Sequence, residues 1–273
     1  MRQRLPNGVT FYYSRRDQAT VDLLAPACSG IQDLIRQMWG LKPPRRCRVY
    51  VMRSLTRFRF RSAPWPMKVL IALLALPLWL SDRWAWKHIP AVTKKCWWQV
   101  AVGIKPLGLY ELTDRTIGLK YMSRGEDVPT RIRSAFCHEL THVSAARLAL
   151  AVWLNEGLAM VTQEAFLGRP LVRPDSLAFV KNRMPKQGPM TYTRLSDEKD
   201  ADSIAYAYAR AYWITRYLRE AHPQLLRDIL SRRRRTSNIE ALVAEGLAIP
   251  RAELWQRIDG MVAEHFEKRQ VAG

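Results

Sequence analysis

The sequence His138-Glu139-Leu140-Thr141-His142 is the feature that most constrains how this chain can fold. Residues four apart lie on one face of a helix, so both imidazoles can face a single metal ion. Glu139 lies between them, where its carboxylate can reach a water on that metal. The spacing therefore predicts a helix here, and with it a metal site of the zinc type.

A second segment, Trp153-Leu154-Asn155-Glu156-Gly157-Leu158-Ala159, follows the pair, and 13 residues separate His142 from Glu156. Zinc sites that do chemistry use three protein ligands and keep a fourth position open. Glu156 is the candidate third ligand. Two His residues on a helix can also be ordinary polar surface, but the second segment favours the metal site.

Apolar periodicity predicts a helix on either side of a tight connection. The first spans 131–150, with start signals at Asp127 and Pro129, and the second spans 154–166, ending before Gly168. Cys137 is turned away from the His138/His142 face, and we expect it to be a small buried residue.

The run from His138 to Ala159 resembles the gluzincin metallopeptidases, and more closely the small bacterial peptidase-MA-like domains with their W-L-N-E-G-x-A pattern. The resemblance implies Zn²⁺ held by His138, His142 and Glu156. It also implies Glu139 as general base, and hydrolysis of a peptide or protein substrate by a zinc-activated water. The match is diffuse from Val9 to about Leu230.

The same families carry a helix that reads Y-A-Q-S after the zinc helices. Tyr208-Ala209-Arg210-Ala211 has that place here and departs from the pattern at Arg210 and Ala211. The resemblance implies that the Tyr208 hydroxyl donates to the oxyanion during attack. The alternative is that Tyr208 and its neighbour Tyr206 are packing residues.

The expected fold class is α+β: a zincin-like domain with a small mixed sheet, the H-E-x-x-H helix and a mostly helical C-terminal half. Strands are expected over 9–13, 48–52 and 116–121, a helix over 19–39 that Pro26 delays or bends, and a long helix over 201–220. We expect the domain to span 1–230, with an apolar and basic insertion at about 54–104. A basic helical segment follows over 231–273.

The insertion contains Arg57-Phe58-Arg59-Phe60-Arg61 and then 12 consecutive apolar residues, 69–80, with Pro77 among them. That run is short of the roughly 20 residues needed to span a bilayer. An Arg-rich start and Trp at both ends are typical of an element at a membrane interface. The alternative is a buried core helix.

The chain has 44 basic and 24 acidic residues, a net charge of +20, which favours polyanionic partners. An anionic membrane surface is the first expectation, nucleic acid the weaker one, and no feature fixes an oligomeric state. Four scattered Cys without a C-x-x-C pair suit a reducing compartment, and no secretory signal is expected at the N-terminus. We therefore expect a cytoplasmic protein, peripheral on the cytoplasmic face of the membrane.

Two other functions stay open. A protease of DNA-bound proteins would suit the charge, but such enzymes use His as third ligand, and none of His88, His222 and His265 follows His142 closely. A non-catalytic, zinc-binding, membrane-associated scaffold is the other alternative. It would have no use for Glu139 as a base.

Overall fold

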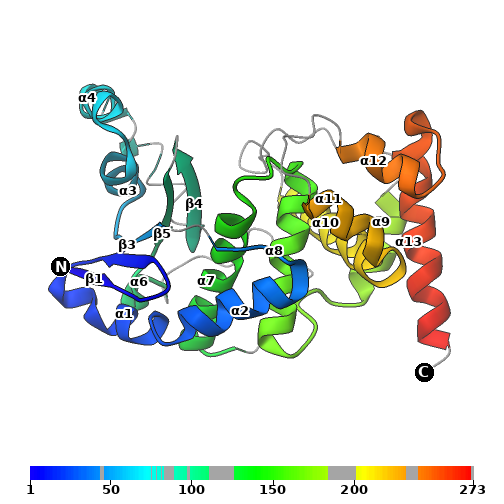
Figure 1. The fold of residues 1–273 in the computed structure, drawn as a ribbon, viewed down its shortest axis with the longest axis horizontal. Coiled ribbons are helices and arrows are strands. Elements are labelled where there is room, and N and C mark those ends of the chain that lie inside the picture. Colours follow the sequence, from blue (N-terminus) through cyan, green and yellow to red (C-terminus); the bar gives the residue numbers. More distant parts are fainter. Residues whose placement is uncertain are drawn as a thin grey trace. The chain divides into compact units, whose positions relative to one another are not determined.

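The structure is a computed structural model that describes residues 1–43, 46–74, 76–77, 79–80, 82, 89–96, 99–110, 126–183, 201–231 and 239–271. Its helices and strands are labelled in Figure 1, and they divide into two compact units. Of the described residues, the first unit comprises those from 1 to 110 and from 126 to 146, and the second comprises those from 147 onwards. A small mixed sheet lies in the first unit and the second is mostly helical, so the expected α+β class is confirmed.

The sheet has five strands in the order β1-β2-β3-β5-β4. They are β1 (Arg2–Arg4), β2 (Val9–Tyr12), β3 (Cys47–Val51), β4 (Ala91–Cys96) and β5 (Gln99–Ile104). The pairs β2–β3 and β3–β5 are parallel, and the two outer pairs are antiparallel. Phe11, Val49 and Val102 are in register on the three central strands, and all three are fully buried. They form the apolar stripe of one face.

That face is covered by α7 (Val128–Ala145), whose Phe136 ring contacts Phe11 at 5.9 Å between centroids. Three shorter helices pack on α7: α1 (Gln18–Leu24), α2 (Ala27–Trp39) and α6 (Leu107–Tyr110). A 3-10 turn, η1 (Arg15–Asp17), precedes α1. Pro26 has no N–H to donate, and the helix expected over 19–39 is divided there into α1 and α2.

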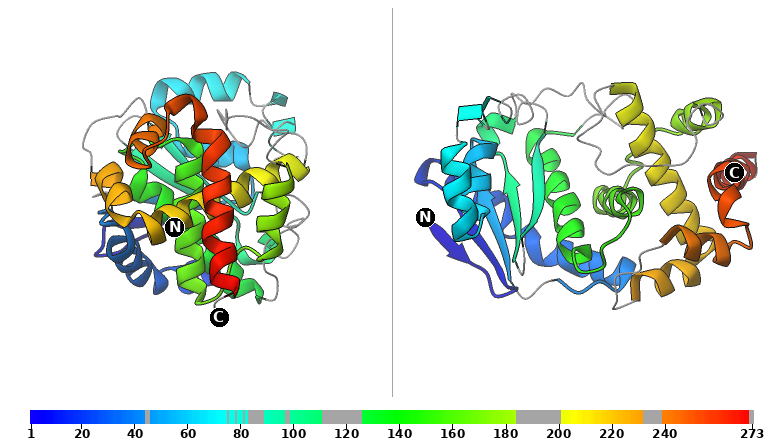
Figure 2. Two further views of the ribbon diagram at one scale, coloured as in Figure 1. Left: turned by 90° about the vertical axis from the view of Figure 1, so that its right-hand side faces the viewer. Right: turned by 90° about the horizontal axis from the view of Figure 1, so that it is seen from above.

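The opposite face of the sheet carries α3 (Leu55–Ser62), and α4 (Trp65–Leu73) packs on α3 (Figure 2). Ser54 caps α3 by accepting a hydrogen bond from the Arg57 N–H at 3.4 Å. Phe58 points onto β5, where a side chain at Gly103 would come within 2.8 Å of its ring. The glycine therefore allows α3 to lie flat on the sheet.

The second unit is built around α10 (Ala201–Ala221), which contacts most of its other helices. These are α8 (Val152–Leu167), α9 (Asp175–Arg183), α11 (Pro223–Ser231), α12 (Ile239–Gly246), the 3-10 turn η4 (Arg251–Glu253) and α13 (Leu254–Val271). A buried ion pair joins α10 to α13. Arg210 donates to both carboxylate oxygens of Asp259, at 2.9 and 2.6 Å, and its guanidinium lies 5.0 Å from the Trp255 ring centroid.

The strands expected over 9–13 and 48–52 are β2 and β3, each within a residue of its expected bounds. Within the expected insertion, Ala91–Cys96 and Gln99–Ile104 form β4 and β5. The strand expected over 116–121 and the Arg232–Arg235 run lie outside the described residues.

Among the described residues, no helix combines the length and the apolar character that crossing a membrane requires.

Candidate metal centre

Helix α7 carries the two His residues, and its start is fixed by local sequence. Asp127 is the N-cap and accepts a hydrogen bond from the Thr130 N–H at 2.8 Å, with Pro129 in the first turn. Hydrogen bonds from Thr130 lower the pKa of Asp127. The helix then runs without a break to Ala145, so residues 138 and 142 fall one turn apart on one face.

The imidazoles of His138 and His142 face each other. Their Nε2 atoms are 2.9 Å apart, and the two rings are nearly perpendicular, at 87°. Both residues are half-buried. A tetrahedral zinc ion bound at 2.0–2.1 Å by each nitrogen would separate them by about 3.3 Å. The pair is therefore within a few tenths of an ångström of the spacing that zinc ligands need.

Glu139 is buried beside this pair, with 7% of its surface exposed. Its Oε2 atom has no hydrogen-bond partner among the described residues. A buried carboxylate oxygen that makes no hydrogen bond is costly and rare in folded proteins, and a bound ligand or reaction partner is a common explanation. Glu139 is thus a buried carboxylate next in sequence to His138, with one oxygen that no described residue satisfies.

The edge strand β4 is fastened to the backbone of α7. The Thr93 hydroxyl donates to the carbonyl oxygen of Glu139 at 3.2 Å, and the Lys95 ammonium donates to that of Ala146. These two contacts hold α7 against the edge of the sheet, one before His142 in the sequence and one after it. The local sequence around Thr93 does not predict this hydrogen bond to α7, because the partner residue lies 46 positions away.

Glu156 lies in the first turns of α8 and is half-buried. The next residue, Gly157, determines how closely α8 packs against α10. A side chain at Gly157 would come within 2.0 Å of the Thr215 hydroxyl oxygen and 2.4 Å of the Ala211 carbonyl oxygen. The glycine therefore lets α8 approach the backbone of α10. A connection of six residues, 146–151, joins α7 to α8, in agreement with the tight helix–loop–helix expected from the sequence.

Tyr208 lies on α10 and is half-buried, whereas Tyr206 and Tyr212 are fully buried. Tyr212 donates to Glu164 and accepts from Arg216 at 2.8 Å, and burial followed by the Glu164 contact raises its pKa. The departure from Y-A-Q-S at Arg210 is structural, because that side chain forms the ion pair with Asp259. Tyr208 is thus the most exposed tyrosine of the three.

The thiols near the sheet have no catalytic character. Cys137 is fully buried as expected, and burial raises its pKa. Burial also raises the pKa of Cys28 to about 11 and that of Cys47 to about 12. None of these three is a thiolate at neutral pH, so none is a ready nucleophile.

The expected site residues are thus distributed over three helices. His138, Glu139 and His142 are together on α7, and Glu156 and Tyr208 are on α8 and α10, which pack against each other. Comparison of the sequence with known protein families gives no match, and comparison with curated proteins finds no similar sequence.

Proposed function

We propose that this chain is a zinc metallopeptidase of the gluzincin type, with a zincin-like fold, that hydrolyses peptide bonds in a peptide or protein substrate. One observation carries the proposal. Two imidazoles on α7 have their Nε2 atoms 2.9 Å apart, and the acid between them is buried with an oxygen that makes no hydrogen bond to the part of the chain that the structure describes.

The proposed ligands are His138, His142 and Glu156. Two neutral imidazoles and one carboxylate are a common ligand set for catalytic zinc, and three protein ligands leave a position open for chemistry. All three side chains are half-buried, and each offers one ligand atom. Partial burial of each side chain supports ligands that are partly shielded from bulk water.

Zinc in this set would polarise the scissile carbonyl and bring the pKa of a water towards about 7. Glu139 takes the proton of the attacking water and transfers it to the leaving amine nitrogen. The Tyr208 hydroxyl donates a hydrogen bond to the carbonyl oxygen as negative charge develops there. A water nucleophile makes a Ser or Cys nucleophile unnecessary, which agrees with the raised pKa of the buried thiols.

Metal content is the first test. The purified chain should hold about one zinc, measured by elemental analysis after dialysis. His138→Ala should remove the metal and Glu156→Ala should weaken its binding by at least tenfold. His222→Ala is the control, because that imidazole bonds to the Tyr217 hydroxyl at 2.9 Å. Full zinc affinity in Glu156→Ala would show that the third ligand is another residue.

Activity is the second test. Hydrolysis of an unstructured protein such as casein should stop in a chelator and return when zinc is restored. Equal turnover with and without chelator would contradict the mechanism. Bound zinc without any hydrolysis would favour the non-catalytic scaffold over the enzyme.

A further inference from the structure

Helices α3 and α4 and the residues after them carry an unusual concentration of exposed apolar side chains. Ten of the eleven large hydrophobic residues that are exposed in the described part of the chain lie between Phe60 and Leu80. We call them the α3–α4 surface: Phe60, Trp65, Met67, Val69, Leu70, Leu73, Leu74, Leu76, Trp79 and Leu80. The alternative of a buried core helix is wrong, because Ile71 alone is buried among the residues of α4.

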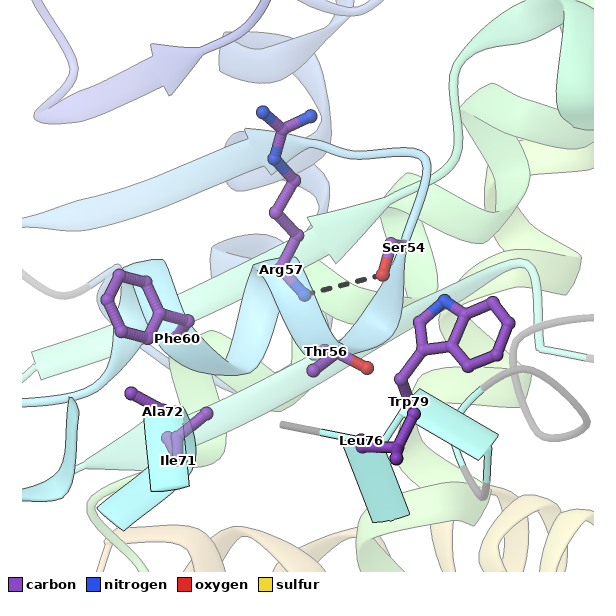
Figure 3. Close-up of a pocket in the computed structure, with 8 residues that line it drawn as sticks. All are labelled: Ser54, Thr56, Arg57, Phe60, Ile71, Ala72, Leu76 and Trp79. Carbon is purple, nitrogen blue, oxygen red and sulfur yellow. Dashed lines mark hydrogen bonds between the residues drawn. The ribbon is translucent and has the colours of Figure 1, made fainter. Parts of the chain in front are cut away.

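The surface is hollowed where α3 meets α4. A cavity of about 640 Å³ is lined by Phe60, Ile71, Leu76 and Trp79 together with Ser54, Thr56, Arg57 and Ala72. Figure 3 shows Phe60 beside Ile71 and Ala72, while the Arg57 guanidinium extends away from these apolar groups. An apolar hollow of this kind can accept an acyl chain.

The stretch of sequence that leads into and through this surface carries charges of one sign. No Asp or Glu occurs between Asp33 and Asp82, and ten Lys or Arg residues occur there. Arg57 and Arg61 are exposed on α3, and the Lys68 ammonium lies 5.9 Å from the Phe60 ring centroid. A cationic margin is complementary to phosphate groups.

The chain that follows the surface is tied back to α3. The buried Asp82 accepts a hydrogen bond from the Thr56 hydroxyl at 2.9 Å and pairs with Arg59 at 3.1 Å. This anchor engages Arg59, whereas Arg57 and Arg61 point to solvent. The segment that carries the exposed apolar groups is therefore anchored to α3 through Asp82.

We propose that the α3–α4 surface binds an anionic phospholipid surface. The apolar side chains enter the boundary between headgroups and acyl chains, and Arg57, Arg61 and Lys68 contact lipid phosphates. Trp65 and Trp79, 76% and 44% exposed, have the character of side chains that prefer this boundary. A second copy of the chain is a poorer occupant, because it would oppose cations to cations. Lipid binding by this surface is independent of the proposed peptidase activity.

Flotation of the full chain with lipid vesicles tests the proposal. At low salt the chain should bind vesicles that contain about one third phosphatidylglycerol, and bind neutral phosphatidylcholine vesicles at least tenfold more weakly. Raising the salt should weaken binding to the anionic vesicles. Equal binding to both compositions would overturn the anionic specificity.

Two pairs of substitutions separate the apolar and charged contributions. Leu70→Ser with Leu73→Ser should lower the vesicle partition coefficient at least tenfold, because two exposed Leu side chains no longer enter the acyl region. Arg57→Gln with Arg61→Gln should lower binding to anionic vesicles several-fold. Arg227→Gln with Arg251→Gln is the matched control: it removes the same charge from exposed positions on the second unit and should change little.

Thermal unfolding and zinc content of each variant show whether the fold and the metal site are intact, so a failed lipid assay is distinguishable from a failed peptidase assay. Absence of vesicle binding, or binding that the Leu pair leaves unchanged, would overturn the proposal. A doubled mass in light scattering that the Leu pair abolishes, without vesicle binding, would assign the surface to a second copy instead.

Discussion

At the scale of single residues, the most unusual feature is the buried carboxylate of Glu139. A carboxylate that is only 7% exposed ordinarily has hydrogen-bond or charged partners for both oxygens. The Oε2 atom of Glu139 has no such partner among the described residues, which lowers the free energy of unfolding. Such a cost is tolerable where the group performs chemistry. This makes Glu139 the sharpest point at which to test the proposed reaction.

Glu139→Gln should keep the zinc and the fold but lower kcat by about 10²–10⁴-fold, because the amide cannot accept the proton of the attacking water. Hydrolysis rates and zinc content of the same preparation check this. Glu267→Gln makes the same chemical change at a residue that is 51% exposed and paired with Lys181, and it should leave turnover unchanged. Turnover equal to wild type in Glu139→Gln would exclude its role as the base.

Tyr208→Phe should lower kcat by about tenfold to a hundredfold with little change in KM, as expected when one oxyanion donor is lost. The effect should be smaller than that of Glu139→Gln. Tyr206→Phe is the control: its ring is fully buried against Phe179, so stability should change more than kcat. If Tyr208→Phe has wild-type kcat, Tyr208 is a packing residue.

At the scale of helices, the contact of α8 with α10 depends on a missing side chain. Gly157→Ala should destabilise the second unit by about 1–3 kcal/mol, because a methyl group would overlap the Thr215 hydroxyl and the Ala211 carbonyl. If Glu156 is a ligand, zinc affinity should fall too. Gly30→Ala is the matched control, since a methyl group there meets nothing within 4 Å and should stabilise α2 by up to about 1 kcal/mol. Chemical denaturation measures both variants.

The join of α10 to α13 depends on a buried ion pair. Arg210→Met should destabilise the second unit by about 3–5 kcal/mol, because the Asp259 carboxylate would be left buried without its partner. The double variant with Asp259→Leu removes both charges and should recover most of the loss. A double-mutant cycle by urea denaturation measures the coupling. Additive losses in the double variant would show that the two side chains act independently.

The helices were predictable where the determinants are local. Pro26 divides α1 from α2, Asp127 caps α7, and Gly168 ends α8 in a left-handed conformation with φ 65°. The His138/His142 geometry follows from helical spacing alone, and so it too was readable.

The unpredicted parts depend on partners distant in sequence. β1 has three residues with two Arg among them, and β4 contains Lys94 and Lys95, so neither shows a strand-like apolar pattern. These strands form because neighbouring strands pair with them. The partners of Gly157 on α10 and the Arg210–Asp259 pair are likewise invisible in a local window, because each joins residues about 50 positions apart.

At the scale of the whole molecule, the net charge of +20 disfavours compact folding through self-repulsion. Raising salt from about 10 to about 150 mM shortens the Debye length from about 30 to about 8 Å. The melting temperature should therefore rise by a few degrees, which calorimetry can measure. A variant with Arg57, Arg61, Arg227 and Arg251 changed to Gln should show a smaller rise. A melting temperature that falls with salt would mean that specific ion pairs outweigh the repulsion.

The sheet order also sets the pace of folding. β3 and β5 are neighbours in the sheet, yet Cys47 pairs with Val100 across about 50 intervening residues that include α3, α4 and β4. The chain must lose the entropy of closing that long loop before the hydrogen bonds of the parallel strands can form. Proteins rich in such non-local contacts fold slowly. The helices of the second unit have local backbone hydrogen bonds, but they too pack through contacts between residues about 50 positions apart. We therefore expect individual helices to form early in a newly made chain, and α7 to pack only after the sheet has formed.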